Sequence, residues 1–263
     1  MKTRGARVYL VVSICLIFAA VPAFTTGCGD SDEVVSEEGW EYITQDSGDD
    51  FGEDVRENNL KGGEGVVHMC GRSVLGGWFE YWGWDWDYEQ PEHFEGYELY
   101  YHEMEVPPDI VYSAEEVAAE LAGLGGGCMF FKLCFDDFEG GDEYTARENL
   151  ERNEEIVQSV VDFAVDEMGL TLILGNALPV VEEYCDRWMV WNQREYNSFL
   201  EGLSREYGDK VVVLDLYGTL ADGEGCLRSE YAADEYDSHL NASAYSALNE
   251  KLEETLDNLL AAP

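Results

Sequence analysis

The chain has 263 residues, of which 46% are apolar and 13% aromatic, enough for one domain with a substantial core. It carries 15 Lys and Arg against 56 Asp and Glu, a formal net charge of −41. Because such a surface repels a phosphate backbone, the composition excludes nucleic-acid binding. The seven cysteines include no Cys-x-x-Cys pair, so their spacing gives no support for a structural zinc site or any other metal site.

The first 27 residues have the layout of a secretory signal. An apolar run without acids, residues 8–24, follows three basic residues: Lys2, Arg4 and Arg7. The run is followed by Thr-Thr-Gly-Cys, residues 25–28, which resembles the lipobox of bacterial lipoproteins. This resemblance implies acylation of Cys28. Thr25 stands where the lipobox has Leu, so simple secretion is the alternative. We therefore expect an exported protein of the cell envelope, held at a membrane only through a lipid anchor.

The segment after Cys28, residues 28–64, is rich in acids, Gly and Ser and has little periodicity. This composition is typical of a solvated spacer, and we predict an acidic tether. An ordered N-terminal extension around residues 40–43 is the alternative.

From residue 65 onward, short apolar runs alternate with longer segments of helical period. Strands are predicted at 66–70, 97–104, 129–135, 170–174 and 211–216, and helices at 113–121, 146–168, 187–207 and 244–260. This order predicts one α/β domain, residues 65–263, with a parallel sheet in a three-layer α/β/α sandwich. In such sheets chemistry collects at the carboxyl ends of the strands.

A serine, Ser73, follows the first predicted strand on a turn flanked by glycines, which let backbone amides approach a ligand closely. A nucleophile would lie at this place. An ordinary strand-to-helix turn is the alternative interpretation.

A histidine, His239, lies between the last predicted strand and the last helix, at the same edge of the sheet as Ser73. A hydroxyl nucleophile needs a base within hydrogen-bond reach and a third group that orients the base. Asp237 or Asp234 could be that third group. Asp237 is favoured because one residue separates it from His239, so both side chains can face the same side. A solvent-exposed loop histidine is the alternative.

Five segments carry a resemblance to a known family. They are GRSVLGGWF (71–79), FKLCFDDF (131–138), LILGNALP (172–179), WNQREYNSFL (191–200) and YDSHLNASAY (236–245). In this order, over about residues 65–260, they resemble a divergent bacterial branch of the SGNH, or GDSL-like, hydrolase superfamily. The resemblance implies a flavodoxin-like sandwich, with Ser73 as nucleophile and His239 as general base.

The resemblance also implies an oxyanion hole formed by backbone amides, those of Ser73 and Gly77. The sequence departs from the family at the side-chain donor, because Asp136 stands where the family has an Asn and Cys134 where it has a Gly. Asn176, also at a strand end, is a candidate substitute donor, with a turn residue as the alternative.

The acid of the family stands three positions before the histidine, where this chain has Tyr236. Asp237 must then replace it, or the catalytic unit is a Ser-His dyad.

Aromatic residues crowd the segment after the serine, between residues 78 and 88. Three of them, Trp78, Trp82 and Trp84, are candidates for a surface on which a sugar ring or an acyl group stacks. A small satellite core that covers the sheet edge is the equally weighted alternative.

Together these features predict an exported serine esterase or acyl hydrolase that transfers an acyl group to Ser73 and needs no cofactor. Its partner would be a small-molecule or glycan ester, with deacetylation of a glycan as one form of the reaction. The alternative is a non-catalytic envelope lipoprotein of the same fold that binds glycan or a partner protein through the tryptophan-rich segment.

Overall fold

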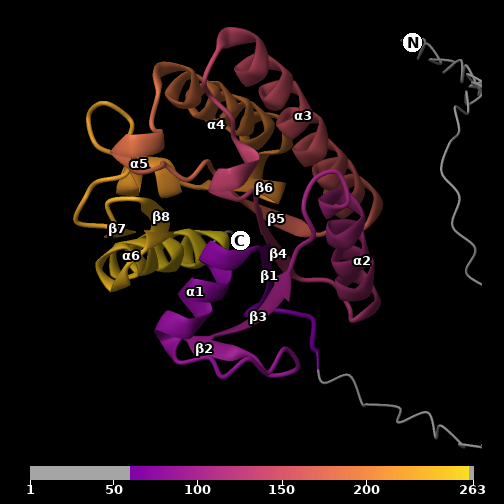
Figure 1. Ribbon diagram of the computed structural model, residues 1–263. Coiled ribbons are helices and arrows are strands. Elements are labelled where there is room, and N and C mark those ends of the chain that lie inside the picture. The colour runs from indigo at the N-terminus through magenta and orange to yellow at the C-terminus, as the bar shows by residue number, and fades with distance from the viewer. Residues whose placement is uncertain (1–59, 261–263) are drawn as a thin grey trace, which may run out of the picture. The chain divides into compact units, whose positions relative to one another are not determined.

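A six-stranded sheet lies at the centre of the folded part of the chain (Figure 1). The structure, a computed structural model, describes residues 60–260, so the predicted signal, Cys28 and most of the predicted tether lie outside the described residues. The strand order is β2-β3-β1-β4-β5-β6. The strands are β1 (Val66–Gly71), β2 (Glu92–Phe94), β3 (Tyr97–Glu103), β4 (Cys128–Lys132), β5 (Thr171–Gly175) and β6 (Val211–Leu214).

The predicted parallel sheet is confirmed, with one difference at its edge. The four pairs that join β3, β1, β4, β5 and β6 are parallel, whereas β2 pairs with β3 in the antiparallel direction. The short β2 lies between the first two predicted strands, where no strand was expected. It covers part of the edge of β3, which would otherwise expose unpaired backbone groups.

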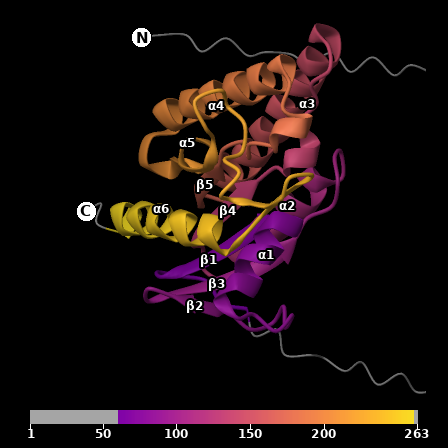
Figure 2. The same ribbon diagram turned by 60° about the vertical axis from the view of Figure 1, so that its left-hand side comes forward.

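Helices cover both faces of the sheet, which confirms the three-layer sandwich (Figures 1 and 2). One face packs against α2 (Ile110–Gly123), α3 (Glu143–Val161) and α4 (Arg187–Tyr207). The other packs against α1 (Ser73–Trp82), α5 (Leu216–Leu220) and α6 (Ala242–Leu260). The predicted helix 146–168 continues past α3 as a π-helical segment, Asp162–Glu167.

Strand β4 shows why the central strands read as continuous apolar runs. Met129 and Phe131 belong to the core under α2, α3 and α4, whereas Phe130 belongs to the core under α1 and α6. A strand covered on both faces has no solvent side, so it shows no alternation of apolar and polar residues.

Besides β2, other elements differ from the sequence-based expectation, among them α5, where no helix was expected. The aromatic segment expected as a loop begins with helix α1, which ends at Gly83 in the left-handed conformation (φ 104°). Strand β4 stops at Lys132, before a 3-10 turn at Phe135–Asp137. The loop expected around His239 is a β-hairpin of β7 (Ala232–Asp234) and β8 (Asp237–Leu240). Short elements of this kind have too few residues to show a period.

The folded part includes a few residues of the predicted tether. The Gly63 amide donates to the Gly126 carbonyl at 2.8 Å, and Lys61 pairs with Glu98 at 3.0 Å. These contacts place residues 61–64 on the sheet domain rather than in a spacer.

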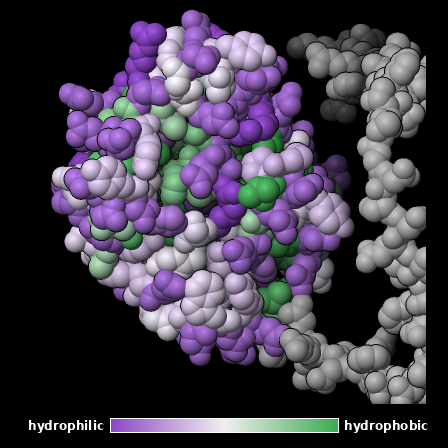
Figure 3. Space-filling model, in the orientation of Figure 1, coloured by the Kyte–Doolittle hydropathy of each residue, from purple (hydrophilic) through white to green (hydrophobic). Residues whose placement is uncertain are grey.

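The surface agrees with the acidic composition. Figure 3 shows hydrophilic residues over most of one face, with hydrophobic residues limited to small separate areas. Within residues 60–260, no helix combines the length and the apolar character needed to cross a membrane.

Two histidines, the buried His68 and the partly buried His102, form a pair under α2. His68 Nε2 lies 2.8 Å from the Lys61 carbonyl, and His68 Nδ1 lies 2.9 Å from His102 Nε2. Since the Lys61 carbonyl can only accept, His68 Nε2 carries the hydrogen of that bond. The Nδ1 atom of the neutral His68 ring then accepts a hydrogen bond from Nε2 of His102. Burial lowers the pKa of both rings, that of His102 to about 3.

This pair predicts a loss of stability in acid. Because its folded pKa values lie below the unfolded value of 6.5, the stabilisation is complete above pH 6.5 and decreases as the pH falls toward 3. Each histidine contributes a slope of up to about 1.4 kcal/mol per pH unit. Urea unfolding at pH 7, 6 and 5 measures the free energy of unfolding. As the pH falls, this free energy should decrease less for His102→Gln than for the wild type. His93→Gln, at an exposed site, is the control, and parallel curves for all three proteins would refute the prediction.

Candidate active site

Ser73 is the first residue of α1 and lies directly beyond the carboxyl end of β1. Its side chain is exposed. The backbone of Arg72 is extended (φ −110°, ψ −155°), which turns the chain from the strand into the helix. The serine therefore lies at the edge where this class of sheet collects its chemistry.

His239 lies on β8, and its Nε2 atom is 3.1 Å from Ser73 Oγ. On the other side of the ring, Nδ1 is 2.6 Å from Asp237 Oδ1. The same carboxylate oxygen accepts the His239 backbone amide at 2.9 Å. Asp237 and His239 are two apart on one strand, so their side chains share a face. The structure thus brings Ser73, His239 and Asp237 into one line of hydrogen bonds.

The carboxylate of Asp237 is held in its ionised form. The hydrogen bonds from the His239 amide and ring lower the pKa of the Asp237 carboxyl. An ionised acceptor at Nδ1 keeps the hydrogen on that atom and leaves Nε2 free to accept the serine proton.

Asp234 has a different partner. Its Oδ1 atom accepts the Tyr236 amide at 2.7 Å, which closes the turn between β7 and β8. The structure therefore places Asp237, not Asp234, beside the imidazole. Tyr236, three positions before the histidine, is exposed, and the carboxylate at Nδ1 comes from the adjacent Asp237.

The hairpin that carries the histidine is tied to α6 by Asn241. Its Nδ2 donates to the carbonyls of Glu230 and Ala232, both at 2.9 Å. Its Oδ1 accepts the amides of Ser243 and Ala244 in the first turn of α6. One asparagine thus joins the start of the hairpin to the helix after it.

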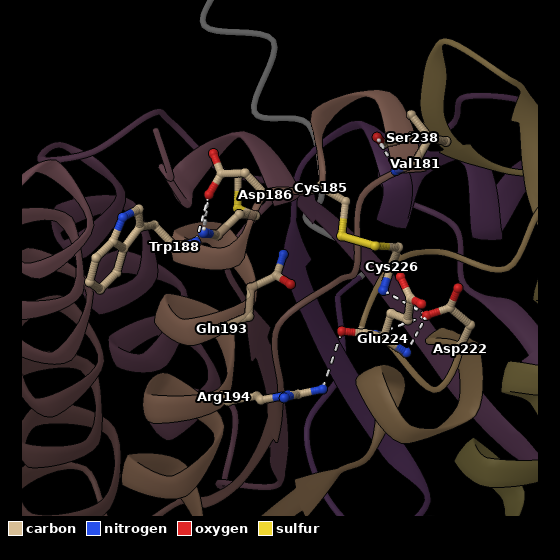
Figure 4. The surroundings of a disulfide bond; sticks show 12 residues. Val181, Cys185, Asp186, Trp188, Gln193, Arg194, Asp222, Glu224, Cys226 and Ser238 are labelled. Carbon is tan, nitrogen blue, oxygen red and sulfur yellow. Dashed lines mark hydrogen bonds between the residues drawn. A yellow bond between two sulfur atoms is a disulfide. The ribbon is translucent and has the colours of Figure 1, made fainter. Parts of the chain in front are cut away.

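A second tie involves a disulfide that the cysteine spacing did not reveal (Figure 4). Cys185 and Cys226 are bonded, and the adjacent Leu227 amide donates to the Val180 carbonyl at 2.8 Å. The next residue, Val181, donates its amide to Ser238 Oγ at 3.2 Å. Ser238 stands between Asp237 and His239. The loop after β5, which contains both Val181 and Cys185, therefore supports the hairpin and is itself anchored by the disulfide.

The first turn of α1 offers amides to an anion. Ser73 and Val74, as its first two residues, have no carbonyl of the helix to bond. Among the described residues, the backbone bonds of this turn begin with Leu75, whose amide donates to the Arg72 carbonyl at 2.7 Å. These two amides lie at the positive end of the helix, beside Ser73 Oγ.

The other two predicted oxyanion residues do not fit that role. Gly77 lies one turn into α1, and a Cβ there would be 2.4 Å from the Tyr245 hydroxyl, so its small size serves helix packing. Asn176 Nδ2 donates to Asp215 at 2.8 Å, and its Oδ1 accepts the Tyr217 amide at 2.8 Å. Both ends of that amide hold the start of α5, which matches the alternative of a turn residue.

The three predicted stacking tryptophans pack inward. Trp78 is 2% and Trp84 5% exposed, and the indoles of Trp78 and Trp82 both donate to Asn249 on α6. The satellite core was therefore the better interpretation, because these rings cover the sheet next to α6. The exposed rings of the segment are Tyr81, Trp86 and Tyr88.

Two residues at the end of β4 were not assigned to the site by the sequence. The ring of Phe135 meets the His239 ring edge to face, with centroids 5.2 Å apart. Asp137 pairs with Arg72 at 2.6 Å and accepts the Cys134 amide at 2.7 Å. Burial raises the pKa of the Asp137 carboxyl, and the Cys134 amide and the Arg72 guanidinium oppose that rise.

Polar residues of α4 hold the loops at this edge in place. The side-chain amide of Asn192 donates to the Glu139 carbonyl, and that of Gln193 to the Leu178 carbonyl. Asn197 accepts the Ala177 amide at 2.9 Å. The loops after β4 and β5 thus rest on one helix.

Comparison with known proteins found no match to the sequence, but it found solved structures with a similar fold. No protein-family model matches the chain, and no curated protein matches it by sequence. A GDSL-like lipase from Bacteroides thetaiotaomicron is similar in structure, with a TM-score of 0.54 and 14% identity over 74% of this chain and 88% of that chain. A candidate acylhydrolase from Bacteroides fragilis has a TM-score of 0.53 and 14% identity over 80% and 99%.

A third structure, a candidate GDSL-like lipase from Parabacteroides merdae, has a TM-score of 0.54 at 10% identity over 76% of this chain and 99% of that chain. Likeness at this level of identity describes the backbone and not the reaction. The chain has the α/β fold of the GDSL-like, or SGNH, hydrolases.

Proposed function

We propose that the protein is a serine ester hydrolase. The observation that carries the proposal is the line of hydrogen bonds from Ser73 Oγ through His239 to Asp237, with distances of 3.1 and 2.6 Å. A non-catalytic binding protein of the same fold has no need of this geometry, so the contact favours the enzyme. The fold of lipases and acylhydrolases is in accord with it.

The reaction proceeds by acyl transfer. His239 Nε2 takes the proton of Ser73 as Oγ attacks the ester carbonyl, and the amides of Ser73 and Val74 receive the resulting oxyanion. His239 then returns the proton to the departing alcohol, which leaves an acyl group on Ser73. Water, deprotonated by the same ring, releases the acid and restores the serine.

For the substrate we propose an ester on a glycan, with an acetyl group as one form. Exposed aromatic rings in the segment after α1, the helix that begins at the serine, support this choice, because sugar rings stack on such surfaces. Trp86 is 55% exposed, and Tyr88 donates its hydroxyl to Glu103 at 3.2 Å. Glu103 is paired in register with Gly71, two residues before Ser73.

We also propose that the protein is exported and anchored by an acylated Cys28. The basic start, the apolar run and Cys28 support this location. The Cys185–Cys226 disulfide supports it too, since such bonds persist in oxidising compartments.

The central test is the removal of the nucleophile. Ser73→Ala should abolish hydrolysis of short-chain aryl esters and of acetylated sugars, because no other group forms the acyl intermediate. Purified mature protein is assayed by release of the phenol or of acetate. Ser243→Ala, a serine on the first turn of α6, is the control and should remain active. Undiminished activity of Ser73→Ala would exclude this site.

The second test concerns the orienting acid. Asp237→Asn should lower kcat by about 10³- to 10⁴-fold, because an amide no longer fixes the tautomer or stabilises the imidazolium. Asp234→Asn, on the same hairpin, is the matched control and should keep kcat within a few fold. Equal and small effects would indicate a Ser-His dyad, and a larger effect at Asp234 would reverse the assignment.

The location is tested by fractionation. Cys28→Ala should move the protein from the membrane fraction to the soluble exported fraction, because the acylated residue is lost. Cys15→Ala, within the apolar run, is the control and should leave the protein on the membrane. A wild-type protein found wholly in the soluble fraction would contradict the anchor.

A further inference from the structure

A lysine is buried at the end of the central strand β4, on the side of the sheet that carries α1. Lys132 is 2% exposed, and within the described residues its Nζ has no hydrogen-bond partner. Phe130, two residues earlier, packs in the core with α1 and α6, and side chains alternate along a strand, so Lys132 faces the same side. An ammonium removed from water without a partner is costly to a fold, so stability does not explain its presence.

The neighbouring strands leave room for this side chain. On one side, Lys132 is paired in register with Gly175 on β5. On the other side, the pairs between β1 and β4 end at Cys70 and Phe131, so the next position in the same register sets Gly71 beside Lys132. A Cβ at Gly175 would lie 2.9 Å from Lys132 Cβ, and one at Gly71 would lie 3.4 Å from Lys132 Cγ. Two glycines thus flank the lysine at the carboxyl edge of the sheet.

Lys132 lies near the ion pair at the turn that carries Ser73. Arg72, next to Ser73, and Asp137 form an ion pair at 2.6 Å and cancel each other in charge. Lys132 lies within electrostatic range of both. Burial lowers the pKa of the Lys132 ammonium, whereas the nearby Cys134 and Asp137 groups raise it. In its protonated form, Lys132 gives the three side chains of Arg72, Asp137 and Lys132 a net charge of +1, opposite in sign to the −41 of the whole chain. Arg152, which donates to the Asp137 carbonyl at 2.9 Å, adds a further positive charge nearby.

A positive charge at this place answers a chemical need of the proposed reaction. The oxyanion on the Ser73 adduct requires stabilisation beyond the first amides of α1, and both side chains weighed for that task are unsuited to it. Asp136 is an acid on the surface, and the amide of Asn176 is bonded to Asp215. In a site of low dielectric, a buried cation acts over several ångströms without contact.

We propose that Lys132 stabilises, through space, the negative oxygen that forms when Ser73 attacks an ester. The inference rests on the proposed ester hydrolysis and deepens it. Lys132 touches neither substrate nor serine in this role. Its charge lowers the energy of the tetrahedral intermediate, with no proton or bond exchanged.

The test is the loss of the charge without loss of volume. Lys132→Met should lower kcat by roughly 10- to 100-fold and leave KM for a neutral ester unchanged. Its melting temperature should stay equal or rise, because an unpaired buried charge is removed. Lys132→Gln, also uncharged, should show the same loss of kcat. Lys251→Met, exposed on α6, changes the net charge equally and should keep wild-type kcat.

A second measurement separates charge from packing. An alkyl boronic acid forms a negatively charged tetrahedral adduct on a serine, so its inhibition constant should rise in Lys132→Met by the same factor as kcat falls. A merely structural lysine would lower the melting temperature and the folded fraction instead, and that result would overturn the inference. A kcat of Lys132→Met equal to that of the wild type would also overturn the inference. If wild type and Ser73→Ala are equally inactive, the proposed function falls as well.

Discussion

The contact between His239 Nε2 and Ser73 Oγ depends on the position of a small hairpin outside the main sheet. The serine is fixed by the strongest part of the fold, since it follows directly on a buried central strand. The histidine is not, because among the strands of residues 60–260 β8 pairs only with β7. The geometry of the site is therefore decided by what holds this hairpin in place.

Three covalent or hydrogen-bonded ties supply that support. Asn241 joins the hairpin to α6, Ser238 joins it to the loop after β5, and the Cys185–Cys226 bond links that loop to the segment after α5 (Figure 4). The two hydrogen-bonded ties also satisfy backbone groups that would otherwise need water. The candidate site on this short hairpin is thus bonded to the sandwich at several points.

The residues around the serine have been rearranged relative to the family that the sequence resembles. The acid beside His239 comes from Asp237, because the preceding position is Tyr236. A carboxylate, Asp136, replaces the asparagine donor, and a buried lysine lies nearby on β4. An ion pair, Arg72 with Asp137, joins the turn before the serine to the turn after β4. These changes alter the charge of the edge while the backbone fold is kept.

The sequence by itself determined the sandwich, the long helices and the edge on which Ser73 and His239 meet. Long apolar periods and buried strands are local patterns, and the topology of a parallel sheet then places their carboxyl ends together. The spacing of one residue from His239 also favoured Asp237 over Asp234. Only the tertiary structure decided the rest: the inward packing of Trp78 and Trp84, the Cys185–Cys226 pair and the isolation of Lys132. Each of these depends on which distant residue lies opposite, and distance along the chain carries no information about that.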